Sequence, residues 1–344
     1  MQDRNLYELI RGIPKTEIHI HLEAVASVDT IWKLKEKHSI SLPDISTKDD
    51  LTRKFKIKSL DEFIALFIDV VQACFLKEED IELLLDDAKN YFKRNNIKYA
   101  EVFFAPSKFI INGLDYQKII TLLDEGAKDL QKNEIKIKYI IDVSRTYGTE
   151  NAMNNLDLTL DYIKDSIIGI GLGGAEKKGR AKDYESIFSK AREKGLHVVA
   201  HAGEDVDSYS IWDAIKHLKT ERIGHGISAI NDQKLMEYLK ETQIPLEVCP
   251  TSNLFTRKYA TTYKNHPIRK FFDKDLYVTV NSDDPVFFNS ELSDEYLRLL
   301  DNEIFSLEEI FQLIKNNIYA TFMDKADKDK FWKEARAYIE KNFN

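Results

Sequence analysis

The sequence predicts a closed (β/α)₈ barrel, an α/β fold formed as a single domain over residues 1–344. The first observation is alternation: eight strand-like runs can be placed along the chain, and amphipathic helical patterns lie between them. Strand and helix units in series indicate a parallel sheet, and eight of them favour a closed barrel, with an open doubly wound sheet as the alternative. The second observation is that polar motifs follow the ends of several runs, where barrel enzymes carry their active sites.

The predicted strands are short stretches rich in β-branched and aromatic residues. They cover Thr16–Leu22, Tyr99–Ala105, Ile135–Val143, Ile167–Leu172, His197–His201, Arg222–His225, Pro245–Val248 and Leu276–Asn281. Apolar residues at helical spacing predict helices between them, such as Asp80–Arg94 and Tyr184–Lys194. The glycine-rich run at residues 169–174 is on the fourth strand rather than after the first, so it does not indicate a dinucleotide site.

Two regions exceed what a minimal barrel needs. Residues 25–79 follow the first strand, are mostly helical in pattern and contain a capping-box sequence at Ser59–Glu62. An insertion at this point hangs over the C-terminal face of the barrel, so we predict a helical substrate lid, with a merely stabilising addition as the alternative. Further helices are predicted after the eighth strand, at Asp294–Leu300, Ser306–Phe322 and Asp327–Asn342.

Composition limits the functional classes. The chain has 43% hydrophobic residues and a formal net charge of −8, which argues against binding to nucleic-acid phosphates. Charges interrupt every apolar stretch before it reaches the length of a membrane-spanning helix, and the first residues do not resemble a signal sequence. We therefore expect a cytoplasmic protein without nucleic-acid or membrane partners. Cys74 and Cys249 do not suggest a disulfide framework, and the oligomeric state cannot be read from the sequence.

Four residues have the chemistry of a zinc site. His19 and His21 alternate on the first predicted strand, so their rings point the same way, and on a barrel that direction can be inward. His201 and Asp283 stand at the ends of the fifth and eighth strands, from which both can reach the same point at the barrel mouth. Imidazole nitrogen and carboxylate oxygen are zinc ligands, and a catalytic site leaves one position for water. We predict one Zn²⁺ per chain, although a lone His-x-His is also typical of hydrogen-bonded or surface histidines.

Three further polar residues are predicted to lie near this metal. Glu204 follows His201 in a turn loosened by a glycine, which suits a proton shuttle beside a metal-held water, although such residues are often solvated loop acids. His225 stands between two glycines, so its backbone is free to bring the ring toward the metal. Asp284 precedes Pro285, where the chain turns, so it can face the site together with its neighbour, although Asp-Asp-Pro is also a common turn sequence.

Five motifs stand in order along most of the chain. They are PKTEIHIHLE at residues 14–23, HAGE at 201–204, RIGHG at 222–226, CPTSN at 249–253 and NSDDP at 281–285. Together they resemble the adenosine and adenine deaminase family of the amidohydrolase superfamily. The resemblance implies a zinc-dependent barrel hydrolase of purine metabolism and salvage, which replaces the 6-amino group of a purine by oxygen.

The resemblance also implies roles for individual residues. It makes His19, His21, His201 and Asp283 the zinc ligands. It makes Glu204 the proton donor to purine N1, and it makes His225 and Asp284 the groups that orient and activate the water. Gly174 resembles the family's glycine that meets the base through its backbone. Glu23 stands where adenosine enzymes carry an aspartate for the ribose 5′-hydroxyl, and His21 and Asp284 are also expected to contact the substrate.

The motifs give mixed indications about the substrate. Glu23 and the aromatic residues after SDDP resemble the adenine-specific relatives, whereas CPTSN and Gly173 resemble the nucleoside enzymes. Arg257 and Lys258 lie in the loop after the seventh strand and could meet an anionic 5′ substituent, or simply be solvated. We predict a 6-aminopurine nucleoside as substrate, namely adenosine, deoxyadenosine or a 5′-modified adenosine. Free adenine is the alternative.

Other classes fit the motifs less well. A catalytically inactive purine-binding barrel would lack part of the acid and base set, yet Glu204, His225 and Asp284 are all present. The zinc deaminases of cytidine and nucleic-acid bases use His-x-Glu with Pro-Cys-x-x-Cys, and this chain has no such cysteine pair. A binuclear hydrolase would commonly need a lysine at the end of the fourth strand, and residues 168–174 contain none.

Overall fold

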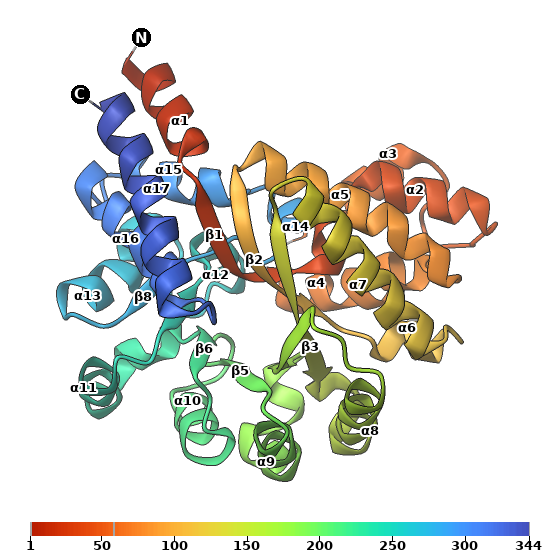
Figure 1. The fold of residues 1–344 in the computed structure, drawn as a ribbon. Helices are drawn as coiled ribbons and strands as arrows, with labels where there is room; N and C mark the ends of the chain where they lie inside the picture. The colour runs from red at the N-terminus through yellow and green to blue at the C-terminus, as the bar shows by residue number, and fades with distance from the viewer. Residues whose placement is uncertain (1, 58, 344) are drawn as a thin grey trace.

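The fold is a parallel eight-stranded barrel surrounded by helices. The computed structural model describes residues 2–57 and 59–343, and its strands pair in chain order from β1 to β8 (Figure 1). Their bounds are β1 Lys15–His21, β2 Ile97–Phe104, β3 Lys136–Ser144, β4 Ile167–Gly173, β5 His197–Ala202, β6 Arg222–His225, β7 Leu246–Val248 and β8 Val278–Val280. Each lies within two residues of its predicted bounds at either end, and the architecture is a TIM-barrel-like α/β fold.

The first and last strands meet just beyond the end of β8. Ile20 and Asp283 form a parallel bridge, in which His21 N donates to Asp283 O at 3.1 Å and Asp283 N donates to His19 O at 3.1 Å. The strands are buried almost throughout, their polar residues included, because one face meets the barrel interior and the other meets helices.

Helices cover the outside of the sheet between successive strands. They are α5 Ile81–Arg94, α7 Tyr116–Lys132, α8 Gly148–Asp161, α9 Glu185–Glu193, α10 Tyr209–Asp213, α11 Gln233–Thr242 and α13 Ile268–Asp273. Shorter helices follow strand ends at α6 Ser107–Ile111, α12 Pro250–Thr256 and α14 Pro285–Phe288. The amphipathic pattern that predicts α5 has its physical basis in burial, since its apolar residues Ile81, Leu84, Ala88 and Phe92 are all inaccessible to solvent.

The chain between β1 and β2 contains α2 Val28–Lys37, α3 Lys48–Lys54 and α4 Leu60–Leu66. Ser59 caps α4 by accepting a hydrogen bond from Glu62 N. The helix then loosens into a π-helical segment at Phe67–Val71. In Figure 1 these helices lie to one side of the barrel.

The chain after β8 forms α15 Leu292–Asp301, α16 Leu307–Ala320 and α17 Lys325–Phe343. Ser306 and Glu309 make the reciprocal bonds of a capping box at the start of α16, which packs on β8 and β1. The N-terminal helix α1, Gln2–Gly12, was not among the predicted elements. It packs against α15 and α17, so the two ends of the chain lie together (Figure 1).

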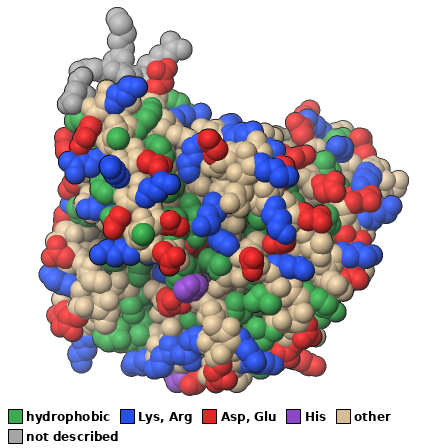
Figure 2. Space-filling model, in the orientation of Figure 1, with side chains coloured by type: hydrophobic (Ala, Val, Ile, Leu, Met, Phe, Trp, Pro, Cys, Tyr) green, Lys and Arg blue, Asp and Glu red, His purple; other side chains and the backbone are tan. Residues whose placement is uncertain are grey.

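No helix in the described part of the chain is both long and apolar enough to span a bilayer. On the face drawn in Figure 2, acidic and basic side chains are interspersed rather than gathered into a field of one sign.

A buried ion cluster fills the barrel interior beneath the mouth. Arg222 of β6 pairs with Glu101 of β2 and, through Nε at 2.6 Å, with Glu247 of β7. All three side chains are 1% exposed or less. A buried guanidinium between two carboxylates compensates both charges, so each partner depends on it.

Arg222→Leu is therefore expected to destabilise the protein by about 3–5 kcal/mol, because it leaves two carboxylates buried without their cation. Urea unfolding followed by circular dichroism measures this change. Arg336→Leu is the control, since Arg336 pairs with Glu340 on the surface and both are more than half exposed. Equal unfolding midpoints for the two variants would contradict the assignment.

Candidate active site

Four ligand atoms converge at the C-terminal mouth of the barrel. His201 Nε2 lies 3.1 Å from His19 Nε2 and 3.2 Å from His21 Nε2. Asp283 Oδ1 lies 3.4 Å from Nε2 of His19 and 3.4 Å from Nε2 of His21. Ligands about 2.0–2.1 Å from a tetrahedral zinc ion are separated from one another by roughly 3.3 Å. The set therefore has the spacing and chemistry of a zinc site, and its members are buried.

The backbone explains how residues so far apart in sequence meet. His19 and His21 are alternate residues of β1 and point to the same side, as the strand period requires. Asp283 has φ of 65°, a conformation uncommon for residues other than glycine, and it is held there by the bridge to β1. The contact that joins β8 to β1 thus also brings the carboxylate to the histidines.

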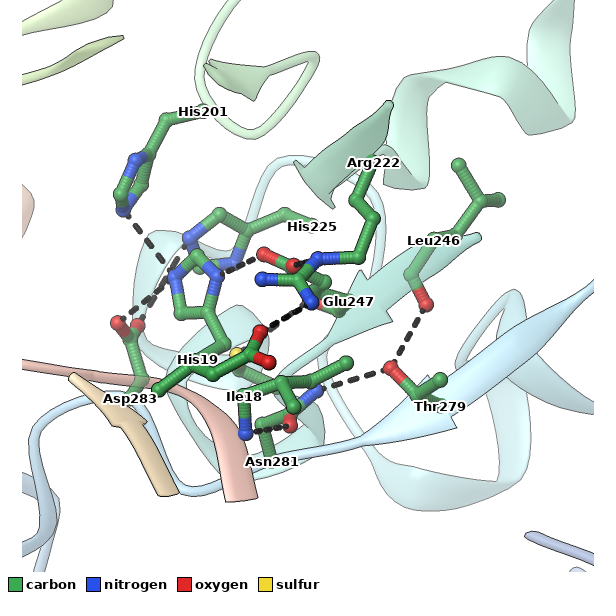
Figure 3. A network of polar contacts seen from close by, with 12 residues as sticks. Ile18, His19, His201, Arg222, His225, Leu246, Glu247, Thr279, Asn281 and Asp283 are labelled. Atoms are coloured by element: carbon green, nitrogen blue, oxygen red, sulfur yellow. Dashed lines mark hydrogen bonds and ion pairs between the residues drawn. The ribbon is translucent and has the colours of Figure 1, made fainter. Parts of the chain in front are cut away.

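Glu247 fixes the orientation of His19. His19 Nδ1 donates to Glu247 Oε2 at 2.7 Å, which turns Nε2 toward the other ligands (Figure 3). Burial lowers the pKa of His19, but hydrogen bonds to Asp283 and Glu247 outweigh it and raise the pKa to about 9. Gly224 allows the ring to fit, because a Cβ at this position would lie 2.8 Å from His19 Cε1. The negative groups around this ring favour a cation at the site.

His225 is held as a neutral ring in one tautomer. Ile268 N–H donates to His266 Nδ1 at 3.1 Å, so His266 carries its proton on Nε2, 3.3 Å from Asn253 Oδ1. The Asn253 amide then donates from Nδ2 to His225 Nδ1 at 3.0 Å. Burial lowers the pKa of His225 to about 4 and that of His266 to about 3. His225 therefore presents Nε2–H to the site, 3.5 Å from Glu204 Oε2.

Glu204 stands on a loop that one buried carboxylate organises. Glu176 accepts backbone hydrogen bonds from four consecutive residues, 203–206, and a further bond from the Ser210 hydroxyl. Burial, followed by the charges of Asp283 and Glu176, raises the pKa of Glu204 well above its ordinary value. The raised pKa favours the protonated form of Glu204, which can donate a hydrogen bond or a proton.

The two neighbouring aspartates differ in protonation. Burial raises the pKa of Asp283, but its interactions with the rings of His225, His19 and His21, including hydrogen bonds from His19 and His21, outweigh burial, so its pKa lies well below the ordinary value. Burial and the charge of Asp283 raise the pKa of Asp284 well above its ordinary value. One carboxyl is thus suited to bind a cation and the other to take up a proton.

These groups face a single cavity with polar and apolar walls. It holds about 830 Å³ of space between atoms, counting the part open to solvent. The segment between β1 and β2 supplies an apolar wall of Phe63, Ile64, Phe67 and Ile68 together with Gln72. Phe288 and Tyr147 extend this wall from other loops.

The structure brings most of the predicted site residues together. The cavity is lined by His21, His201, Asp283, Glu204, His225, Asp284 and Gly174. His19 lies directly behind them, with no exposed surface.

Glu23, Arg257 and Lys258 are outside the lining. Glu23 is fully buried, and its Oε1 accepts from Gln72 Nε2 at 3.1 Å and from Ala105 N at 2.9 Å. It therefore lies behind two residues that do line the cavity. Lys258 binds the carbonyl of Asp205 at 2.8 Å and lies 3.5 Å from the Asp207 carboxylate.

The sequence model of the adenosine deaminase family matches residues 14–338. The chain belongs to the adenosine deaminase family. Members of this family are hydrolases that act on C–N bonds in cyclic amidines, and this chain is one of them.

Individual members of the adenosine deaminase family resemble the chain over nearly its full length. An aminodeoxyfutalosine deaminase of Streptomyces avermitilis is 33% identical, over 97% of this chain and 94% of the relative. An adenosine deaminase of Clostridium kluyveri is 32% identical, over 96% and 95%. The crystal structure of an adenine deaminase from Arthrobacter aurescens superposes with a TM-score of 0.90 at 28% identity, over 96% and 100%. The names of these three proteins thus give three different substrates, although their sequence identities to this chain are similar.

Sequence reasoning missed Glu176, Glu247, Asn253 as a hydrogen-bonding residue, and Asp142. Glu247 and Asp142 are charged residues inside otherwise apolar strands, a signal that a buried polar role exists. Glu176 stands next to the quoted Gly174 but carries no motif of its own. Its role depends on a loop that begins 27 residues further along the chain.

Asn253→Asp is expected to lower kcat by roughly 100-fold or more, because a carboxylate would demand the proton on Nδ1 of His225 and remove it from Nε2. Steady-state kinetics with bound zinc measured in parallel tests this. Asn302→Asp is the control, since the Asn302 amide binds only the carbonyl of Arg298, away from the cavity. A normal kcat for Asn253→Asp would refute the tautomer assignment.

Glu176→Gln is expected to reduce kcat by roughly 100-fold, since an amide group cannot accept hydrogen bonds at both of its ends and the loop of Glu204 shifts. The loss should be in kcat rather than in zinc content, which metal analysis would verify. Glu185→Gln offers a comparison, because Glu185 pairs with His217 on the surface. The loop assignment fails if both variants retain full activity.

Proposed function

We propose that the chain is a zinc-dependent deaminase that converts a 6-aminopurine nucleoside into the 6-oxo product and ammonia, with one Zn²⁺ per chain. The observation that carries this is the convergence of three imidazoles and one carboxylate, with the ligand atoms of the described pairs 3.1–3.4 Å apart, at a cavity that Glu204 also lines. Adenosine deaminase family membership supports the reaction class, while the substrate within that class rests on the cavity.

His19, His21, His201 and Asp283 are proposed to hold the zinc ion. When bound there, zinc supplies Lewis-acid activation of a water molecule near neutral pH. Nucleophilic addition at C6 of the purine moves electron density to N1, and protonated Glu204 is placed to donate its proton at N1 as this charge develops.

His225 and Asp284 are proposed to position the attacking water. Neutral His225 donates a hydrogen bond from Nε2 to the water oxygen, and Asp284 accepts a proton from the water through its carboxyl. A carboxylate with a raised pKa is the stronger base, so the environment of Asp284 suits this task. The same proton can then pass to the leaving amino group.

Residues 25–79 are proposed as a lid. Phe63, Ile64, Phe67 and Ile68 present apolar surface to the cavity, and such a cover excludes bulk water from the reacting groups. The π-helical segment at Phe67–Val71 interrupts the regular helix at this wall.

Nucleoside and free base are distinguished by the wall opposite the metal. Gly174 has φ of 77° and lines the cavity, and a Cβ there would lie 2.3 Å from Ser144 Oγ, so its backbone forms this part of the wall. The support for a nucleoside is the likeness of CPTSN at residues 249–253 and of Gly173 to the nucleoside enzymes. One observation favours free adenine as the second candidate: the carboxyl of Asp142 occupies the space that Gly173 leaves, which narrows the room for a sugar.

Purified zinc-loaded protein is expected to release ammonia from adenosine or a 5′-modified adenosine with a higher kcat/KM than from adenine. Metal analysis should give one zinc per chain. Deoxyadenosine completes the substrate panel. Preference for adenine by the wild type would reject the nucleoside assignment, and absence of ammonia from every 6-aminopurine would reject the proposed function.

Glu204→Gln is expected to retain zinc and lose most turnover, whereas His201→Ala should lose both. Because the protonated form of Glu204 is the active one, kcat/KM of the wild type should fall as pH rises through the raised pKa of Glu204. Glu185→Gln, at a surface residue that pairs with His217 outside the cavity lining, serves as a control for the substitution itself. A Glu204→Gln enzyme at wild-type speed contradicts the proton-donor role.

A further inference from the structure

A carboxylate that no motif indicates faces the substrate cavity. Asp142 lies on β3, is 3% exposed and lines the cavity. Its Oδ1 is buried and has no hydrogen-bond partner among the described residues. A buried acceptor without a donor is costly, and because the Asp142 side chain lines the cavity, a ligand bound there can supply a donor to this carboxyl.

Two glycines of the neighbouring strand β4 leave room for the Asp142 carboxyl. Asp142 pairs with Gly171 in the β3–β4 register, and Gly173 follows two residues later on the same face. A Cβ on Gly171 would lie 2.8 Å from Asp142 Oδ1, and one on Gly173 would lie 2.1 Å from Oδ2. Any other residue at either position would displace the Asp142 side chain, so the two glycines and the acid form one unit.

Asp142 carries a charge under ordinary conditions. Burial raises its pKa to about 6, and the positive charges of His21, Arg145 and His19 limit the rise. At neutral pH it is therefore mainly a carboxylate, which accepts hydrogen bonds and cannot donate them. A ligand atom that hydrogen-bonds to the Asp142 carboxylate must therefore be the donor.

The position of Asp142 decides which part of a purine can supply that donor. The proton donor Glu204 follows β5, and His225 and Asp284 follow β6 and β8. Asp142 is on β3, away from these strands in the barrel order. If C6 and N1 face the metal and Glu204, the edge with N3 and N9 is turned away from them. Free adenine offers N9–H at this edge, and a nucleoside offers sugar hydroxyls attached through N9.

We propose that Asp142 is a specificity-determining residue that accepts a hydrogen bond from an N–H or O–H donor at the N9 side of the 6-aminopurine. This inference rests on the proposed function and extends it. The Asp142 carboxylate thereby distinguishes substrates by the group that they carry at N9. Gly171 and Gly173 leave the space that the Asp142 side chain occupies.

The test compares Asp142→Asn and Asp142→Ala with the wild type on substrates that differ by one donor. Adenine is paired with 9-methyladenine, which has no donor at N9. Adenosine is paired with its 2′-, 3′- and 5′-deoxy forms. Loss of a hydrogen bond to a charged acceptor should lower kcat/KM about 10- to 100-fold, mainly through KM, for the substrate that carries the donor. The substrate that lacks this donor should be turned over equally by variant and wild type.

The pattern of losses identifies the source of the donor. A loss for adenine but not for 9-methyladenine identifies N9–H, and a loss for adenosine that vanishes with one deoxy form identifies that hydroxyl. Equal losses on all substrates, or none on any, would overturn the proposal. If the wild type acts on adenine alone, the nucleoside assignment is rejected. The comparison of adenine with 9-methyladenine then still tests the role of Asp142.

Two controls exclude a purely structural effect. Asp124→Asn removes another buried acid from the same side of the barrel, where it binds Ser166 and Lys128 away from the cavity, and its substrate ratios should match the wild type. Calorimetric binding of inosine and hypoxanthine gives a readout independent of turnover. If Asp142→Ala fails to fold, the near-isosteric Asp142→Asn carries the test alone, and unchanged substrate ratios in it would contradict the proposal.

Discussion

The closure of the barrel is the constraint on which the rest of the structure depends. The bridge between Ile20 and Asp283 joins the end of the sheet to its beginning, and it also sets one carboxylate beside two histidines. His201 completes the group from the opposite side of the barrel. Because lone pairs of four ligand atoms lie 3.1–3.4 Å apart in these pairs, a cation or protons between them would stabilise the cluster. The contact that closes the barrel therefore also assembles the candidate metal site.

Polar groups around the cluster each have a defined donor and acceptor pattern. Glu247 fixes His19 from beneath, and the series from Ile268 through His266 and Asn253 fixes His225. Glu176 gathers four backbone amides and thereby holds the loop of Glu204. These contacts immobilise the reacting groups before a substrate arrives, which is the condition for electrostatic catalysis. They also explain why many charged residues of this chain are buried.

Much of the fold and of the metal set could be predicted because both follow local rules. A strand period of two places His19 and His21 on one face, and alternating patterns mark eight strands to within two residues. Hydrogen bonds between residues that are far apart in the sequence do not follow from local periodicity. Nothing local shows that Glu23 turns behind Gln72 and Ala105, or that Lys258 pairs with the loop of Glu204 instead of facing the cavity.

The sequence by itself determined the order of strands and helices, the residues available to a metal and the class of reaction. These depend on hydrophobic periodicity and on which side chains stand at strand ends. Only the tertiary structure decided the spacing of the ligand atoms, the tautomer of His225, the protonation of Glu204 and the exposure of Asp142 to the cavity. The reason is that distances and pKa values depend on burial and on neighbours brought together by packing, and both exist only once the chain has folded.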